Sequence, residues 1–461
     1  MINKKPDNLF KWGKQPLLKI LKYAGLGIGA ALFIAVVAFL LFPDHFVNIL
    51  LKDRVTKAFK KAYPADSIKL GDMHYNIWEN RLGCDSITLK TTGYKCSVVS
   101  FSVKGINWIK IFLRNEFTTN TLNGSVIDAH KIKLNFLKFQ KELRFEMLHI
   151  SVPDSEMTAD SIKYFSLIND EHFFAESKFR QTRYNFDIPQ MKMMGLNCLG
   201  LLQGNIYSAK SIHIIGLFAD ILVNMDKPYD LNSPNPQMPN EFLSSMKEKV
   251  KIDDLKIING RLKYCERFVI KETPGEVSFT KANVSVSRIS NQSDNPAITI
   301  IKGEGLFLNS GTMKLFMEIP LMSKKFSLRY SGSVSMMDVN KINSFIEAGE
   351  HRRIKSGVLQ SAKFNINVAS GHASGSLGVE YKDLSIAVLN KKTRSEKGIF
   401  DRIASLYGKI FIIRGSNLPD KNGNMKIGNT QYSRRSDDYF FQFIWFALRN
   451  GVADVVGFSP I

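Results

Sequence analysis

The stretch GVLQSAKFNINVASGHASGSLGVEYKDLSIAVL, residues 357–389, predicts two β-strands joined by a turn. Apolar residues fall on one face of the first strand: Val358, Ala362, Phe364, Ile366 and Val368. Polar residues fall on the other: Ser361, Lys363, Asn365 and Asn367. Alternation with a period of two is typical of a sheet that has one apolar and one polar side. The apolar side either packs against a second sheet or stays open for a ligand, and the period does not distinguish these.

The same alternation extends over most of the chain between residues 67 and 390. Shorter runs at 73–77, 99–103 and 143–147 alternate in this way, and Gly, Asn and Ser separate them. A second apolar set lies on one face of the run at 312–319: Met313, Leu315, Met317 and Ile319. Asn259-Gly260 is typical of a tight turn between antiparallel strands. The fold class is therefore predicted to be mainly β, with most strands antiparallel.

The N-terminal part predicts a membrane anchor. Residues 23–42 carry no charge, and about 20 apolar residues match the thickness of a bilayer. A cleaved signal peptide fits less well, because its apolar region is shorter and no small-x-small site follows. Lys22 adjoins the predicted span, whereas the first lysine after it is Lys52. We therefore expect residues 1–22 to be a basic cytoplasmic tail and the large remainder to lie on the other side of the membrane.

The remainder divides into predicted segments by pattern and composition. Residues 44–63 have apolar residues at helical spacing with lysines beside them, which predicts an amphipathic helix. This helix either lies on the membrane surface or caps the first sheet. Two β-rich halves follow, at 64–226 and 249–390. Between them, residues 227–248 hold Pro228, Pro234, Pro236 and Pro239, which predict an exposed linker or loop.

The C-terminal segment, residues 391–461, predicts an apolar helix. Asp437 and Asp438 are suitable N-terminal caps for it. Its aromatic and aliphatic residues are Phe440, Phe441, Phe443, Ile444, Trp445 and Phe446. The run is shorter than the roughly 17 residues that a membrane span requires. Such a helix is buried at the end of the sheet, lies in a membrane interface, or closes an apolar groove.

Composition and motifs argue against an enzyme. The net charge of +21 favours an anionic partner, and an acidic lipid surface fits better than nucleic acid because the Lys and Arg residues are spread along the chain. The histidines and the four cysteines form no metal-binding spacing, and whether Cys84 and Cys96 are bridged stays open. The segment DKNGN, residues 420–424, fails as a calcium loop at Met425 and Gln431. We expect no catalytic residue, no metal and no cofactor.

Four segments in order resemble the AsmA-like proteins of Gram-negative envelopes. They are residues 46–89, 250–268, 354–389 and the terminal FFQFIWFALRNGVADVVG at 440–457. The resemblance implies an inner-membrane protein with a periplasmic domain, in which a curled antiparallel sheet forms an apolar groove as in TamB-like and chorein-type lipid-transfer proteins. It also implies binding or transfer of phospholipid in outer-membrane biogenesis and lipid homeostasis.

On that interpretation the two apolar sets, at 358–368 and 313–319, face the groove, and the terminal helix closes its far end. The expected partners are phospholipid acyl chains, the membrane and other envelope proteins. The charge outside residues 1–22 is +16, which is +21 less the +5 of six Lys and one Asp, and it favours anionic headgroups near the rim. The alternative is a membrane-tethered scaffolding protein with a closed β-sandwich, which produces the same alternation.

Overall fold

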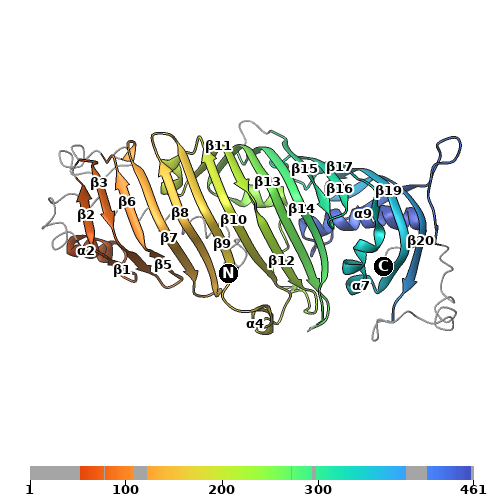
Figure 1. Cartoon of the computed structure of the whole chain (residues 1–461), viewed down its shortest axis with the longest axis horizontal. Helices are drawn as coiled ribbons and strands as arrows, with labels where there is room; N and C mark the ends of the chain where they lie inside the picture. The colour runs from red at the N-terminus through yellow and green to blue at the C-terminus, as the bar shows by residue number, and fades with distance from the viewer. Residues whose placement is uncertain are drawn as a thin grey trace, which may run out of the picture.

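The structure is a computed structural model that describes residues 52–76, 78–106, 122–270, 272–292, 297–390 and 413–457. One long sheet runs the length of the molecule, with the first strands at one end and the last at the other (Figure 1). The mainly β fold class is confirmed. The predicted span at 23–42 lies outside the described residues. Of the helices in the described ranges, none is long and apolar enough to cross a membrane.

The strands follow one another along the sheet almost in chain order. The first are β1 (Ser67–Leu70), β2 (Met73–Asn76), β3 (Arg81–Cys84), β4 (Ile87–Lys90), β5 (Tyr94–Val98), β6 (Ser100–Lys104), β7 (Val126–Phe136), β8 (Lys141–Ser151), β9 (Glu156–Ser166) and β10 (Thr182–Met194). The next are β11 (Ile206–Ile215), β12 (Phe218–Asn224), β13 (Lys249–Arg267), β14 (Gly275–Ser290), β15 (Thr299–Phe307) and β16 (Gly311–Ile319). The last are β17 (Leu328–Val334), β18 (Met337–Asp338), β19 (Arg352–Ala369), β20 (His372–Val388) and β21 (Ile427–Ser433).

Short strands lie end to end at two places. The pairs β5 and β6, β4 and β3, and β1 and β2 form two short ladders side by side along β7. Likewise β11 and β12 together cover the length of β10. The sheet is continuous across the boundary that was predicted between two halves, because β13 pairs with both β11 and β12. The described strands therefore form one sheet, not the two sheets of a sandwich.

The junction between β12 and β13 departs from the predicted antiparallel pattern. Both β11 and β12 run parallel to β13, whereas the other paired strands are antiparallel. A parallel neighbour requires a crossover connection, and residues 225–248 provide it. Residues 231–237 are largely exposed, as the prolines predicted, but Met238 and Leu243 of α6 and its cap (helix Pro239–Ser245) are buried in the core. This segment is a crossover packed on the sheet.

Short helices complete the fold. Within the predicted helix at 44–63, the structure describes α2 (Lys52–Ala62), and its Phe59 is buried beside the first strands. This part of the helix therefore caps the sheet. The other helices are α4 (Asp170–Ala175), α5 (Cys198–Gln203), η3 (Val339–Ile342), α7 (Asn343–Glu350) and α9 (Phe440–Val456).

The predicted turn at Asn259-Gly260 is wrong, because both residues lie inside β13. The register between β13 and β14 shifts on either side of Gly260, and Asn259 has φ 53°. A β-bulge needs the same left-handed backbone as a tight hairpin turn, so the dipeptide suits both. By contrast, the turn predicted between the strands of residues 357–389 is present at Ser370 and Gly371, with φ 52° and 81°.

Candidate functional site

The strand register shows how side chains line up across the sheet. Residues directly opposite on neighbouring strands point to the same face, so each register step extends a row. One row consists of Met73, Cys84, Phe101, Ala129, Leu148, Ala159, Met191, Ile214, Ile257, Val284, Gly303, Leu315, Gly332, Phe364, Leu377 and Gly428. We call it the first inner row. It contains no charged side chain from one end of the sheet to the other.

A second inner row lies two residues further along each strand and has the same character. It consists of Tyr75, Leu82, Val103, Ile127, Ile150, Met157, Met193, Ile212, Leu255, Val286, Ile301, Met317, Tyr330, Ile366, Gly375 and Thr430. Together the two rows make one side of the sheet, which we call the inner face, apolar across all the strands that they join.

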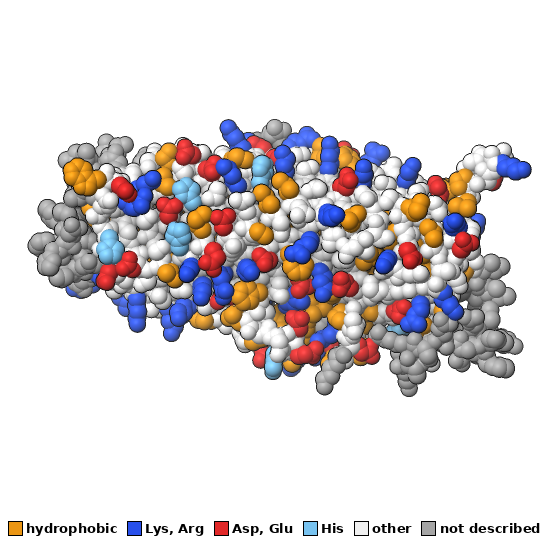
Figure 2. Space-filling view, in the orientation of Figure 1, with side chains coloured by type: hydrophobic (Ala, Val, Ile, Leu, Met, Phe, Trp, Pro, Cys, Tyr) orange, Lys and Arg blue, Asp and Glu red, His pale blue; other side chains and the backbone are white. Residues whose placement is uncertain are grey.

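A third row lies between the two inner rows. Its side chains are mostly polar and point to the opposite side of the sheet, which we call the outer face. It runs through His74, Gly83, Ser102, Asp128, His149, Thr158, Lys192, His213, Lys256, Ser285, Lys302, Phe316, Ser331, Asn365, Ser376 and Asn429. The broad face shown in Figure 2 has this mixed character, since its apolar side chains are scattered among charged ones. The sheet therefore separates an apolar side from a polar side along its whole length.

The residues predicted to line a groove share the inner face, with one exception. Strand β17 lies between β16 and β19, and one residue of β17 is opposite both members of each of three pairs. The pairs are Leu315 and Phe364, Met317 and Ile366, and Met313 and Ala362. Val368 and Ile319 are buried in the same core. Val358 was placed wrongly: the register of β19 shifts between Leu359 and Ser361. This bulge turns Leu359 inward, where it is buried, and Val358 outward.

The inner face is covered at both ends and less covered in the middle. At the N-terminal end Leu82, Val103 and Ile127 are at most 1% exposed. At the C-terminal end Ile366 is fully buried and Phe364 is 6% exposed. Between them, Ile212 is buried, but the other inner-row side chains of β10 to β15 are only half-buried, namely Met191, Met193, Ile214, Leu255, Ile257, Val284, Val286 and Ile301. We call these residues the middle section.

Helix α9 covers the C-terminal end of the inner face. Phe443 of α9 is fully buried, with its ring 5.1 Å from Phe326 and 5.5 Å from Tyr432. Of the predicted helix residues, Phe443 and Ile444 face the core, Phe440 and Phe446 are half-buried, and Phe441 and Trp445 are 73% and 37% exposed. Phe364 and Ile366, which were predicted to line a groove, thus belong to the same core as this helix.

The predicted capping of α9 by Asp437 and Asp438 is wrong. Tyr439 is the N-cap residue, and Gln442 accepts a hydrogen bond from its backbone N–H at 3.4 Å. The Asp438 carboxylate instead accepts from the Tyr432 hydroxyl at 2.9 Å and from the Arg435 backbone N–H at 2.8 Å. Asp438 therefore fixes the turn that leads from β21 into α9.

A polar cluster that the sequence did not predict lies on the inner face near the first residues of α9. Tyr184, Ile221 and Tyr264 are opposite one another in the register. The Tyr264 hydroxyl donates to Glu266 at 2.7 Å, and Gln442 of α9 also bonds to this carboxyl. Burial raises the pKa of Glu266. In the sequence, this cluster was indicated only by Tyr264 and Glu266, two polar residues at inward positions near the end of β13.

Glu266→Gln is expected to stabilise the protein increasingly as pH rises. Because the folded state raises the pKa of Glu266, its contribution to stability is present below the ordinary pKa of Glu and is lost as pH rises through the raised pKa. Glutamine imitates the protonated form and has no such dependence. Urea unfolding of both proteins over a series of pH values from acid to neutral measures the difference between their free energies of unfolding. A gap that is the same at all pH values would contradict the expectation.

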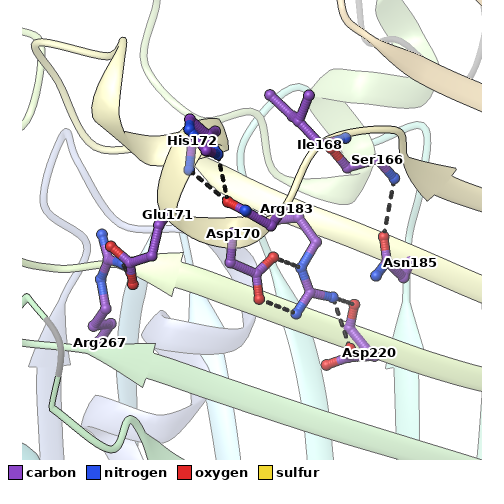
Figure 3. A network of polar contacts seen from close by, with 10 residues as sticks. Ser166, Ile168, Asp170, Glu171, His172, Arg183, Asn185, Asp220 and Arg267 are labelled. Atoms are coloured by element: carbon purple, nitrogen blue, oxygen red, sulfur yellow. Dashed lines mark hydrogen bonds and ion pairs between the residues drawn. The ribbon is translucent and has the colours of Figure 1, made fainter.

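The outer face carries a separate network that holds α4 (Figure 3). The Arg183 guanidinium donates to Asp170 of α4 at 2.9 Å and to Asp220 at 2.7 Å. Arg267 donates to Glu171 at 3.0 Å, and its guanidinium lies 4.8 Å from the centre of the Phe174 ring. Both arginines are at most 5% exposed. Since these buried charges are paired with carboxylates, the network is best explained as structural.

The described residues offer neither a metal-binding cluster nor a reactive thiol. No group of metal-binding side chains occurs within the described ranges. Cys84, Cys96, Cys198 and Cys265 are free thiols, and burial raises the pKa of each. Unreactive protonated thiols are expected in such positions.

No protein-family model matches the chain, and no curated protein matches it. The apolar inner face is therefore the feature from which a function is inferred.

Proposed function

We propose that the protein binds phospholipid acyl chains on the middle section of the inner face and transfers or holds the lipid between membranes without catalysis. The observation that supports this is the pair of inner rows, which offer an apolar path without a charged residue. Each CH₂ group moved from water onto such a surface contributes about 0.8 kcal/mol. Binding of this kind needs no acid, base, metal or cofactor.

The place of the protein in the cell is part of the same proposal. An inner-membrane anchor at 23–42, with a cytoplasmic N-terminus and a periplasmic sheet, would bring the inner face close to a lipid source. The resemblance to AsmA-like proteins supports a role in outer-membrane biogenesis and lipid homeostasis. The basic balance of the chain favours anionic membrane surfaces.

The test uses the full-length chain in phosphatidylethanolamine vesicles that contain a phosphatidylethanolamine with a photoreactive acyl chain. The variant Ile257→Asp/Val284→Asp places two carboxylates opposite each other on the first inner row. Burying acyl chains against charges is unfavourable, so we expect at least about a tenfold loss of labelling. In the wild type the labelled peptides should map to β10 to β15, which carry the middle section.

The matched control is Lys256→Asp/Ser285→Asp, which changes the opposite pair one residue away, on the outer row. It introduces the same side chains on the same strands and should keep the labelling. Circular dichroism and thermal unfolding check that both variants are folded. Equal labelling of the two variants would contradict lipid binding on the inner face. A wild type that takes up no label would reject the proposal and favour the tethered scaffolding protein.

A further inference from the structure

The polar cluster on the inner face has hydrogen-bond donors for which the described residues provide no acceptor. Arg180 precedes β10, and its backbone N–H donates to the Pro228 carbonyl at 2.8 Å. Its side-chain Nε is buried, and it finds no hydrogen-bond partner within the described ranges. The Tyr229 hydroxyl, on the crossover connection, is also buried and has no partner among the described residues. Unused buried donors are uncommon in folded proteins and call for an explanation.

The charge of Arg180 is poorly neutralised by its neighbours. Arg180 lies within electrostatic range of Glu266, Tyr264 and Tyr439. The Glu266 carboxyl already accepts from Tyr264 and bonds to Gln442, and burial favours its neutral form. Arg180 forms no ion pair within the described part of the chain. A guanidinium with its N–H groups free is suited to two oxygens of a phosphate or carboxylate.

Tyr229 adds a second donor within electrostatic range of this guanidinium. Burial, with Tyr439, Asp437 and Asp230 nearby, raises the pKa of Tyr229. Its hydroxyl is therefore protonated at neutral pH and can donate to an anionic oxygen. The acids near Tyr229 also oppose an anion, so the balance between them and Arg180 is what the experiment measures.

The polar cluster lies on the same face of the sheet as the middle section, further along the same strands. Along β13 the inward side chains change from Leu255 and Ile257 to Tyr264 and Glu266. Along β10 they change from Met193 and Met191 to Tyr184, and both Tyr184 and Arg180 lie within electrostatic range of Tyr264. An amphipathic molecule would therefore have its chains on the two inner rows and its polar end at the edge of the sheet.

We propose that Arg180 and Tyr229 bind the oxyanion headgroup, a phosphate or carboxylate, of an amphipathic ligand whose chains occupy the middle section. This assignment rests on the proposed function, since it places the headgroup of the ligand proposed there. A soluble phosphate ester has the same oxyanion, so the test includes one without chains.

The experiment compares two photoreactive lipids with the same acyl chains, phosphatidic acid and diacylglycerol, in phosphatidylcholine vesicles with the full-length chain. We expect the wild type to label with phosphatidic acid about tenfold more than with diacylglycerol, which is the effect of a charge-assisted hydrogen bond. Arg180→Gln should remove this preference and leave diacylglycerol labelling unchanged. The matched control is Arg329→Gln, because Arg329 is an exposed residue of β17.

Tyr229→Phe is a second variant that removes one hydroxyl, and it should lower the preference for phosphatidic acid several-fold. Equal labelling by both lipids in the wild type, or an unchanged preference in both variants, would overturn the headgroup site but leave lipid binding intact. No labelling by either lipid would overturn the proposed function itself. Complete competition by glycerol 3-phosphate, which has no chains, would assign the site to soluble phosphate esters and overturn the amphipathic ligand.

Discussion

Ile366→Ala is expected to lower the free energy of unfolding by about 2–5 kcal/mol, the range for truncating a fully buried large aliphatic side chain. Ile366 lies in the second inner row, where Tyr330 and Gly375 are its register neighbours, and it is 0% exposed. The loss arises because the cavity would lie between a hydrogen-bonded sheet and the packed core that includes Phe443 of α9, and neither can move in to fill it.

The adjacent residue Asn367 provides the control, since it is exposed on the outer side of the same strand. Asn367→Ala should change the free energy of unfolding by no more than about 0.5 kcal/mol. Urea unfolding followed by circular dichroism measures both variants. Similar small losses at the two positions would mean that α9 does not cover this part of the sheet as described.

Gly428→Ala is expected to separate α9 from β21, at a cost of about 1–3 kcal/mol for an overpacked contact. A Cβ atom at Gly428 would lie 2.2 Å from the Gly451 carbonyl oxygen and 2.8 Å from Val455 Cγ2. The backbones of the strand and the helix are therefore in direct contact. Relief requires movement of a backbone segment, because a carbonyl oxygen has no other rotamer.

Hydrogen–deuterium exchange of the full-length chain tests this expectation. Amides of residues 440–456 should exchange faster in Gly428→Ala, whereas those of β7 to β9 should keep their wild-type rates. Gly83→Ala is the matched control, because a Cβ atom there would meet its nearest neighbour at an ordinary 3.7 Å. Unchanged exchange in α9 would show that the helix adjusts without leaving the sheet.

The face of each strand was predictable from the sequence, because it depends only on local alternation. Phe364, Ile366, Leu315 and Met317 were placed on one side of the sheet by their spacing, and the register confirms this. Val358 failed because an extra residue in a bulge reverses the alternation, and nothing in the composition of VLQSA indicates a bulge. Asn259-Gly260 failed for a related reason, since its backbone preference suits a bulge and a turn equally.

What covers each part of that face was not predictable, because the covering elements come from distant parts of the chain. Ile366 and Ile257 have similar patterns around them, yet Ile366 is fully buried and Ile257 is half-buried. Ile366 belongs to a core that includes Met238 of the crossover and Phe443 of α9, which lies 77 positions later in the chain, whereas Ile257 belongs to no such core. The parallel position of β13 likewise depends on how the crossover at 225–248 packs, through Met238 and Leu243.

The order of the strands has a consequence for synthesis of the chain. Most register partners are neighbours in sequence, so hairpins can form in turn as the chain leaves the ribosome, and local contacts of this kind fold quickly. Helix α9 is synthesised after every strand that it covers. Until then, Met238 and Leu243 of the crossover can pack on the inner side of β16 to β20, but the part that α9 covers stays exposed, and an exposed apolar sheet in a nascent chain is prone to aggregate. A chaperone or a membrane surface is needed most during this interval, and residues 440–456 end it.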